Sequence, residues 1–245
     1  MSLYAFNPQR FTDSQLYVKV IGGNKLLIKT YLNADKFARR DMELTKNQHW
    51  RKCGFDVPEM LDMQCAGIVE PHVVMRYVPG IRLSEYLKNG ETAFTEKLVT
   101  LEAIFKLNYR RHGLALAHND LLLLHTDPNT DNIILDQGAI WFIDFEHIAA
   151  RQDVLAGVGN EVATFARRVI KDLGIAHTSA VIRALLEAYQ FNDTIMDKVE
   201  ELTFARPFQF MHRLKHALRK RTQAKQVTRY DIADAIRNLR LGHKE

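Results

Sequence analysis

The first third of the chain places short apolar runs between polar turns, a pattern typical of β-strands. Residues 16–21 (LYVKVI) and 25–31 (KLLIKTY) are two such runs, and Gly22-Gly23-Asn24 between them predicts a hairpin turn. Residues 34–53 then change to a highly charged pattern with helical period. The apolar VVM at 73–75 predicts a buried strand that leads into a linker.

The remainder of the chain is dominated by the helical period, with one hairpin inside it. We expect a helix at LSEYL with Ser84 as its N-cap, and another over residues 95–112 that Gly113 ends. The runs IIL and IWFIDF, joined by Asp136-Gln137-Gly138, predict the hairpin. Five later helices are predicted over residues 160–173, 178–190, 194–204, 207–224 and 229–240.

These patterns predict an α+β protein with two lobes. The small β-rich lobe, an antiparallel sheet with one helix, covers residues 1–75, a hinge covers 76–80, and a larger, mainly helical lobe covers 81–245. A chain of 245 residues, 47% hydrophobic and 26% charged, is long enough to give two such lobes a proper core. Disorder over any long stretch is therefore not expected.

Composition also predicts where the protein works. The start of the chain has no signal-peptide pattern, and the longest apolar run is far shorter than the roughly 18 residues of a membrane span. Two cysteines in dissimilar contexts are best interpreted as reduced thiols. We therefore expect a cytoplasmic protein, and its net charge of +5 favours an anionic partner.

Two neighbouring segments, HTDPNTDNIIL at 125–135 and WFIDFE at 141–146, concentrate oxygen ligands. They contain Asp127, Asn132 and Asp144, and one interpretation is simply a polar turn followed by a hairpin. The other is an apparatus for a metal-bound nucleotide, because Mg²⁺ prefers oxygen ligands and phosphoryl transfer needs positioning and charge neutralisation.

Two more residues bear on this choice. Lys29 lies in the middle of the strand LLIKTY and Glu43 on the helix that follows. Taken singly, each has an ordinary interpretation, an outward lysine on an amphipathic strand and a glutamate on a solvated helix face. Along the chain, however, a strand lysine, a helix glutamate, a linker and the two oxygen-rich segments follow one another in that order.

That order resembles the protein-kinase-like superfamily over about residues 10–170. HTDPNTDNIIL is similar to the catalytic loop H-x-D-x-x-x-x-N, IDFE stands where kinases carry Asp-Phe-Gly, and VVMRYVPG resembles the hinge. The segment from residue 38 to 61 also resembles small bacterial kinases and antibiotic phosphotransferases. The resemblance implies a bilobal kinase-like fold that uses ATP and Mg²⁺.

The resemblance also implies an ATP site in the first lobe. Lys29 would contact the α- and β-phosphates, with Glu43 paired to it. Met75 would be the gatekeeper at the back of the adenine pocket, while the Arg76 carbonyl and the Val78 amide would bind the adenine edge.

The remaining roles fall on the two later segments. Asp127 would be the catalytic carboxylate that orients the acceptor hydroxyl, and Asn132 and Asp144 would be the metal ligands. His125 is interpreted as a packed scaffold residue rather than as an acid or base.

The sequence departs from the kinase pattern at several places. No G-x-G-x-x-G precedes Lys29, so we expect residues 7–15, which contain no glycine, to cover the phosphates. Glu146 replaces the glycine after Asp-Phe, and Thr126 replaces the arginine that usually binds a phosphorylated activation loop. No Ala-Pro-Glu follows Asp144. A conventional eukaryotic-type protein kinase is therefore disfavoured.

Within the superfamily, the motifs most resemble compact bacterial kinases that phosphorylate sugars of the lipopolysaccharide inner core. The predicted function is transfer of the γ-phosphate to such a sugar or a similar anionic glycan, in lipopolysaccharide biosynthesis. An atypical Ser/Thr protein kinase with a protein acceptor is the first alternative. A nucleotide-binding pseudokinase that acts as an interaction module is an alternative of another class.

A basic segment, residues 206–229, contains eight Lys or Arg and no acidic residue. It is interpreted either as a packed terminal helix with a solvated cationic side, or as a docking surface for anionic headgroups, phosphorylated sugars or nucleic acid. The second interpretation predicts peripheral contact with the inner face of the membrane. Nucleic-acid binding alone is not expected, because it leaves the kinase-like residues unexplained.

Overall fold

The fold is described from a computed structural model of the chain, which covers residues 4–5, 14–65, 67–147, 153–204 and 227–243. The chain forms two compact units. Unit 1 consists of Met1–Ile81 and Asn132–Ile148, and unit 2 consists of Arg82–Asp131 and Ala149–Glu245. The predicted boundary placed residues 81–245 together, so the grouping of Asn132–Ile148 differs from that prediction.

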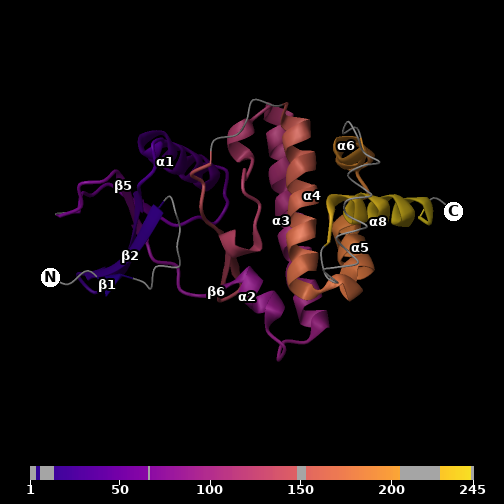
Figure 1. Cartoon of the computed structure of the whole chain (residues 1–245), viewed down its shortest axis with the longest axis horizontal. Helices are drawn as coiled ribbons and strands as arrows, with labels where there is room; N and C mark the ends of the chain where they lie inside the picture. The colour runs from indigo at the N-terminus through magenta and orange to yellow at the C-terminus, as the bar shows by residue number, and fades with distance from the viewer. Residues whose placement is uncertain (1–3, 6–13, 66, 148–152, 205–226, 244–245) are drawn as a thin grey trace. The chain divides into compact units, whose positions relative to one another are not determined.

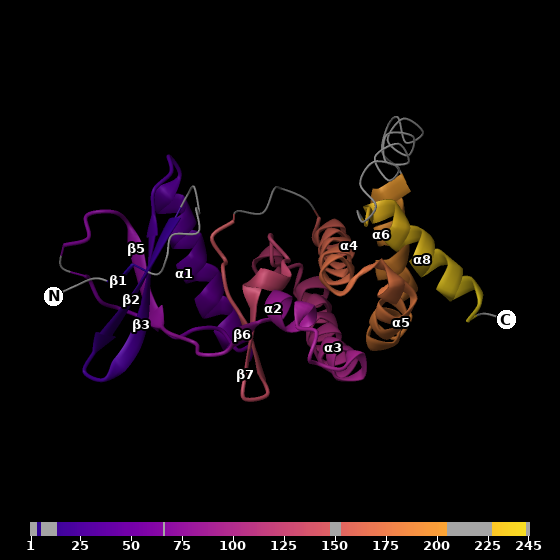
Figure 2. The same cartoon turned by 60° about the horizontal axis from the view of Figure 1, so that its bottom comes forward.

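Unit 1 contains a five-stranded antiparallel sheet in the order β1-β2-β3-β5-β4 (Figures 1 and 2). Its strands are β1 (Tyr4–Ala5), β2 (Ser14–Ile21), β3 (Asn24–Tyr31), β4 (Met60–Leu61) and β5 (His72–Arg76). The predicted hairpin is present, because β2 and β3 pair from Ile21↔Asn24 outwards. Gly22 and Gly23, with φ of 56° and 79°, supply the left-handed backbone that this tight turn needs.

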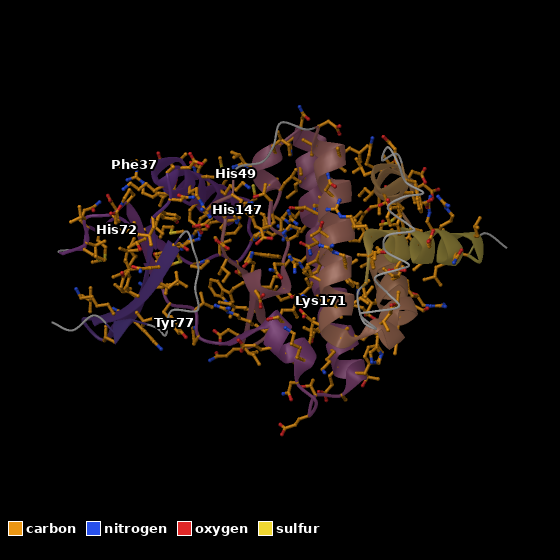
Figure 3. All side chains as sticks on the ribbon, viewed as in Figure 1. Phe37, His49, His72, Tyr77, His147 and Lys171 are labelled. Carbon is orange, nitrogen blue, oxygen red and sulfur yellow. The ribbon has the colours of Figure 1, made fainter. Side chains whose placement is uncertain are left out.

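Helix α1 (Lys36–Lys52) lies alongside this sheet (Figure 2) and buries an unusually polar face. The buried residues follow helical spacing: Arg39, Glu43, Lys46, Asn47 and Trp50. Trp50 is fully buried, and its ring packs edge-on against Phe142 at 5.2 Å between ring centroids. Phe37, in contrast, is 58% exposed on the outer side of the helix (Figure 3). The polar residues of the buried face therefore need partners inside unit 1.

A second sheet has the order β6-β7-β8, with β6 (Ile81–Arg82), β7 (Ile133–Asp136) and β8 (Ala139–Phe142). The Phe142 amide donates to the Asp56 carbonyl at 2.9 Å, which attaches the β7–β8 hairpin to the loop after α1. Gly80 has φ +135°, and a Cβ there would collide with the Leu135 carbonyl oxygen. These contacts explain why the hairpin belongs to unit 1.

Unit 2 is helical and is built around two long helices, α3 (Phe94–His118) and α4 (Val154–Leu173), which lie side by side (Figure 1). Among the described residues, the other helices are α2 (Leu83–Lys88), α5 (Thr178–Ala188), α6 (Asp193–Phe204) and α8 (Arg229–Leu241), with short 3-10 turns η1 (Leu121–Leu123), η2 (Thr130–Asn132) and η3 (Ile175–His177). Helix α4 carries the core of this unit, since Val158, Ala166 and Ile170 are fully buried.

Three predicted helix boundaries are wrong. Helix α3 continues through Gly113 to His118, and Asn119 ends it with a left-handed φ of 50°. Ser84 is not the N-cap of α2, because Arg82 holds that position and the Ser84 hydroxyl donates to Asp131 instead. Helix α4 starts six residues earlier than predicted, where Asp153 accepts from the Ala156 amide at 2.8 Å.

Two further predictions concern residues that the structure leaves undescribed in whole or in part. The predicted helix 207–224 lies outside the described residues, as do residues 7–13 of the predicted phosphate-covering loop, whereas Ser14 and Gln15 belong to β2. In the part of the chain that is described, no helix combines the length and hydrophobicity needed to cross a membrane.

Candidate active site

The centre of the candidate site is the side chain of Lys29 in β3. Lys29 is 6% exposed, and its Nζ lies 2.8 Å from Glu43 Oε2 and 2.5 Å from Asp144 Oδ1. Strand β3 runs between β2 and β5, with Lys29 opposite Leu16 and Val73, and Glu43 is on the buried face of α1. Neither residue is therefore the solvated surface side chain that its local pattern allows.

The charge of Lys29 is fixed by its neighbours. Burial alone lowers the pKa of the ammonium group, but the carboxylates of Glu43, Asp144 and Glu146 outweigh this effect and raise the pKa well above its ordinary value. Lys29 is therefore cationic throughout the physiological pH range. A buried cation of this kind is stabilised only while its partners remain charged and in place.

Asp144 and Asn132 are brought together by the β7–β8 hairpin. The Ile143 amide donates to the Asn132 carbonyl at 3.0 Å, which continues the ladder one step beyond the Ile133↔Phe142 pair. Asp144 follows with φ of 69°, in the left-handed region that non-glycine residues seldom adopt. Its side chain is 29% exposed and hence within reach of a ligand. Strained backbone of this kind is concentrated at functional sites.

The acidic residues around Lys29 fit a hard cation. Oxygens of Glu43, Asp144 and Glu146 all lie within 4.8 Å of one another, and carboxylate and amide oxygens are the ligands that Mg²⁺ prefers. Lys29 stands at the centre of these three carboxylates, and Asp144 is the most exposed of them. Asp144, with Asn132 beside it in the hairpin, is therefore the residue of this set that could hold a metal ion.

The predicted adenine-binding residues lie at the end of β5 and just beyond it. Met75 is 5% exposed and packs in one cluster with Tyr31 and Val73. The Arg76 amide donates to the Glu59 carbonyl at 2.9 Å, so the start of the linker is bonded to the loop that precedes β4. Within the described residues, the Val78 amide makes no hydrogen bond to another backbone carbonyl.

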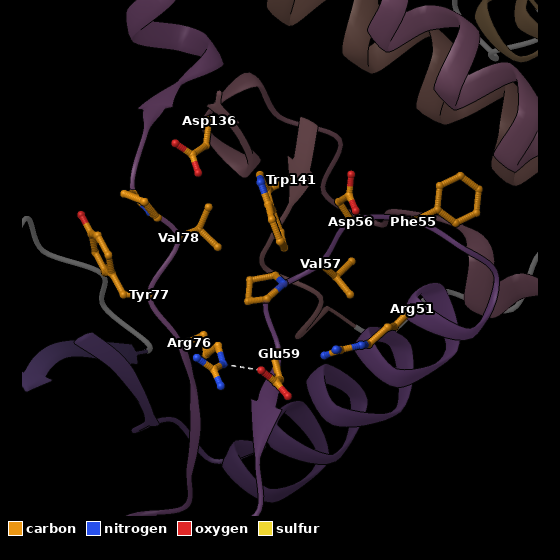
Figure 4. Close-up of a pocket in the computed structure, with 12 residues that line it drawn as sticks. Arg51, Phe55, Asp56, Val57, Glu59, Arg76, Tyr77, Val78, Asp136 and Trp141 are labelled. Atoms are coloured by element: carbon orange, nitrogen blue, oxygen red, sulfur yellow. Dashed lines mark hydrogen bonds and ion pairs between the residues drawn. The ribbon is translucent and has the colours of Figure 1, made fainter. Parts of the chain in front are cut away.

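A hollow of about 270 Å³ lies next to this linker (Figure 4). It is lined by Arg51, residues 55–59, residues 76–79, and Asp136 and Trp141 of the hairpin, and an ion pair between Arg76 and Glu59 closes one side. Arg76 and Val78, the residues predicted to bind the adenine edge, line it, whereas none of the predicted phosphate-binding and metal-binding side chains does.

Asp127, the predicted catalytic carboxylate, belongs to unit 2 and is half-buried in the segment before η2. The same segment is firmly anchored. The buried Thr130 hydroxyl donates to Asp172 Oδ2 at 2.5 Å, and Asp172 also pairs with Lys88 at 3.1 Å. His125 is 4% exposed, as expected for a packed scaffold residue. Helix α4 thus supports the loop that carries Asp127.

A buried polar cluster in unit 2 was not foreseen from the sequence. Glu161 of α4 binds Arg111 at 2.8 Å and His112 at 2.5 Å, and the Tyr189 hydroxyl lies 2.9 Å from His112 Nδ1. Arg111 also donates to the Leu123 carbonyl at 2.5 Å, two residues before His125. The signal available in the sequence was a single acid within the apolar first half of α4.

This cluster has strongly shifted pKa values. Burial opposes ionisation of Glu161, but Arg111 and His112 outweigh it and lower the pKa of the carboxyl to about 2. Burial, reinforced by the Arg111 charge, lowers the pKa of His112. Glu161 is therefore an anion whose counter-charge is Arg111, and its role is to join α3 to α4.

Solved structures, among them a kinase domain, share this fold. No protein-family model matches the chain, and no curated protein matches it in sequence. A structural search finds a point mutant of the kinase domain of PknI from Mycobacterium tuberculosis, with 16% identity, 77% of this chain and 92% of that chain covered, and a TM-score of 0.50. It also finds WaaP in complex with acyl carrier protein, with 10% identity, coverage of 86% and 87%, and a TM-score of 0.56.

At these identities the similarity concerns the fold, which is protein-kinase-like. A small antiparallel sheet with one helix and a larger helical part agree with the predicted fold class. The resemblance stated from the sequence motifs is thereby confirmed at the level of the fold.

Proposed function

We propose that this chain is an ATP- and Mg²⁺-dependent phosphotransferase that moves the γ-phosphate to an acceptor hydroxyl. The observation that carries the proposal is the buried Lys29, which lies 2.8 Å from Glu43 and 2.5 Å from Asp144. A lysine held by two carboxylates, one of them part-exposed, provides a fixed cation next to a potential metal ligand. Phosphoryl transfer needs both of these features.

Each residue has a proposed role. Lys29, oriented by Glu43, would bind the α- and β-phosphates, and Asp144 and Asn132 would hold Mg²⁺, which neutralises phosphate charge when bound. Asp127 would orient the acceptor hydroxyl for attack. The adenine ring would be bound at the linker by Met75, Arg76 and Val78.

The proposed acceptor is a sugar of the lipopolysaccharide core or a similar anionic glycan. It is supported by the resemblance of the motifs at 125–135 and 141–146 to kinases of such sugars, and by the basic segment 206–229, of which residues 206–226 lie outside the described residues. A protein acceptor is the second candidate. Because WaaP was solved with acyl carrier protein, a protein of that type is the first protein partner to test.

The test measures which acceptor receives the labelled phosphate from γ-labelled ATP. The purified chain is incubated with Mg²⁺ and labelled ATP, in separate reactions with lipopolysaccharide, with protein and with small-molecule pools. Label in the lipopolysaccharide supports the proposed acceptor, and label in protein supports the second candidate. If no pool is labelled although Mg·ATP binds, the chain is a pseudokinase; if Mg·ATP does not bind, the proposal is wrong.

A further inference from the structure

Glu146 occupies a position where the kinase resemblance expects glycine, and it is buried. It is 4% exposed, and its Oε2 lies 2.9 Å from Lys29 Nζ. Its other oxygen, Oε1, accepts from the guanidinium group of Arg39. Glu146 is thus a third carboxylate next to Lys29, the residue that is proposed to bind the phosphates of ATP. Buried charges of this kind need a partner that stays in place.

Arg39 provides that partner from α1. Its side chain is 10% exposed, so the guanidinium group is removed from water and meets Glu146 inside unit 1. Lys29 already pairs with Glu43 and Asp144. Arg39 therefore gives Glu146 a counter-charge that does not depend on Lys29.

The face of α1 that carries Arg39 contacts each of the three residues that follow Asp144. Glu43 Oε1 accepts from the Phe145 amide at 3.2 Å, Arg39 binds Glu146, and Lys46 Nζ donates to the His147 carbonyl at 3.3 Å. Positions 39, 43 and 46 share one helix face because they are spaced by four and three residues. The pair Arg39–Glu146 is the central contact of this arrangement.

We propose that Arg39 is a positioning residue for phosphoryl transfer, and that its function is to bind one oxygen of Glu146, so that Glu146 does not retain Lys29 when Mg·ATP binds. The inference rests on the proposed function. When Mg·ATP binds, Lys29 must engage the phosphates, and Asp144 must engage the metal. Glu146, which already contacts Lys29, would compete with the phosphates at that moment, and the Arg39 guanidinium weakens this competition because it neutralises part of the Glu146 charge.

The test is a double-mutant cycle read by steady-state kinetics and by Mg·ATP binding. Arg39→Met is expected to raise the KM for ATP about tenfold, with a smaller change in kcat, because Glu146 then loses its other cation and holds Lys29 more strongly against the phosphates. Adding Glu146→Gln to Arg39→Met is expected to return the KM to within about threefold of wild type. Arg40→Met is the matched control, since Arg40 is the next residue of α1 and pairs with Asp41.

Three outcomes would overturn the inference. They are an unchanged KM for ATP in Arg39→Met, a KM in the double variant as high as in Arg39→Met, and an equal rise of the KM in Arg40→Met.

If thermal unfolding shows that Arg39→Met does not fold, Glu146→Gln alone decides: a KM within about threefold of wild type supports the inference, and a tenfold rise overturns it. A wild type that does not bind Mg·ATP contradicts the proposed function itself, whereas an active wild type without rescue contradicts this inference alone.

Discussion

Asp144 combines a left-handed backbone, a part-exposed carboxylate and an ion pair with Lys29. Asparagine tolerates the same backbone, so Asp144→Asn removes the charge without adding backbone strain. We expect this variant to lose nearly all Mg·ATP turnover, because the proposed metal position loses its charged ligand. The measurement is phosphate transfer over a range of Mg²⁺ concentrations. Near-wild-type turnover would show that Asp144 is not a metal ligand.

The control for this variant is Asp62→Asn, an exposed carboxylate of the same unit. It is expected to leave turnover unchanged. Thermal unfolding of both variants separates a lost ligand from a lost fold.

A second prediction at the residue scale concerns Asp127, whose replacement is expected to change the rate and not the binding of Mg·ATP. Asp127→Asn is expected to keep Mg·ATP binding while kcat falls by roughly two to four orders of magnitude, because the carboxylate orients the acceptor and not the phosphates. Lys29→Met is expected to show the opposite pattern, with weakened ATP binding. Calorimetric titration with Mg·ATP, beside the kinetics, distinguishes the two. Equal losses of affinity and rate in Asp127→Asn would refute this division of roles.

At the scale of elements, helices α3 and α4 are joined by the buried Glu161. Its pKa is lowered in the folded state from an ordinary 4.5 to about 2, so between these pH values the unfolded chain binds more protons than the folded one. The stabilisation is complete above about pH 4.5 and is lost as the pH falls towards 2. From the shift, it amounts to roughly 3 kcal/mol.

Glu161→Gln is therefore expected to lower the free energy of unfolding at pH 7, and the difference from wild type is expected to shrink as the pH falls from 4.5 to 2. Urea unfolding at several pH values measures it. The control is Glu187→Gln, an exposed residue on α5. A difference that stays constant with pH would show that Glu161 acts through packing and not through its charge.

At the scale of the whole molecule, charge is unevenly distributed along the chain. The formal net charge is +5 and residues 206–229 carry +8, so the remainder carries −3. An anionic surface would therefore attract this segment and repel the rest of the chain. Near an anionic membrane each Lys or Arg contributes about 1 kcal/mol, an effect that salt screens.

Reversal of Arg219, Lys220 and Arg221 to Glu is accordingly expected to abolish binding to anionic vesicles at low salt, while basal ATP hydrolysis stays near wild type. The control reverses three exposed residues elsewhere, Lys106, Lys171 and Arg183, and so changes the net charge equally. Sedimentation with anionic and with zwitterionic vesicles is the measurement. Equal losses in both triple variants would mean that net charge, and not this segment, governs binding.

The sequence by itself determined the elements and the order of the kinase-like residues. Alternating apolar runs gave the β2–β3 and β7–β8 hairpins, because the period of a strand and the glycines of a tight turn are local properties. The resemblance to kinases, carried by the order of these residues, implied that Glu43 would pair with Lys29, and the two side chains lie 2.8 Å apart.

Only the tertiary structure decided which charges are buried and what they bind. The pairing of Glu146 with Arg39 and the cluster around Glu161 join residues far apart in the chain, and no local pattern encodes such partners. The end of α3 was missed for a related reason: Gly113 fits within a helix that packs well, and the left-handed Asn119 ends it. Long-range packing and burial, which override local propensity, set these features.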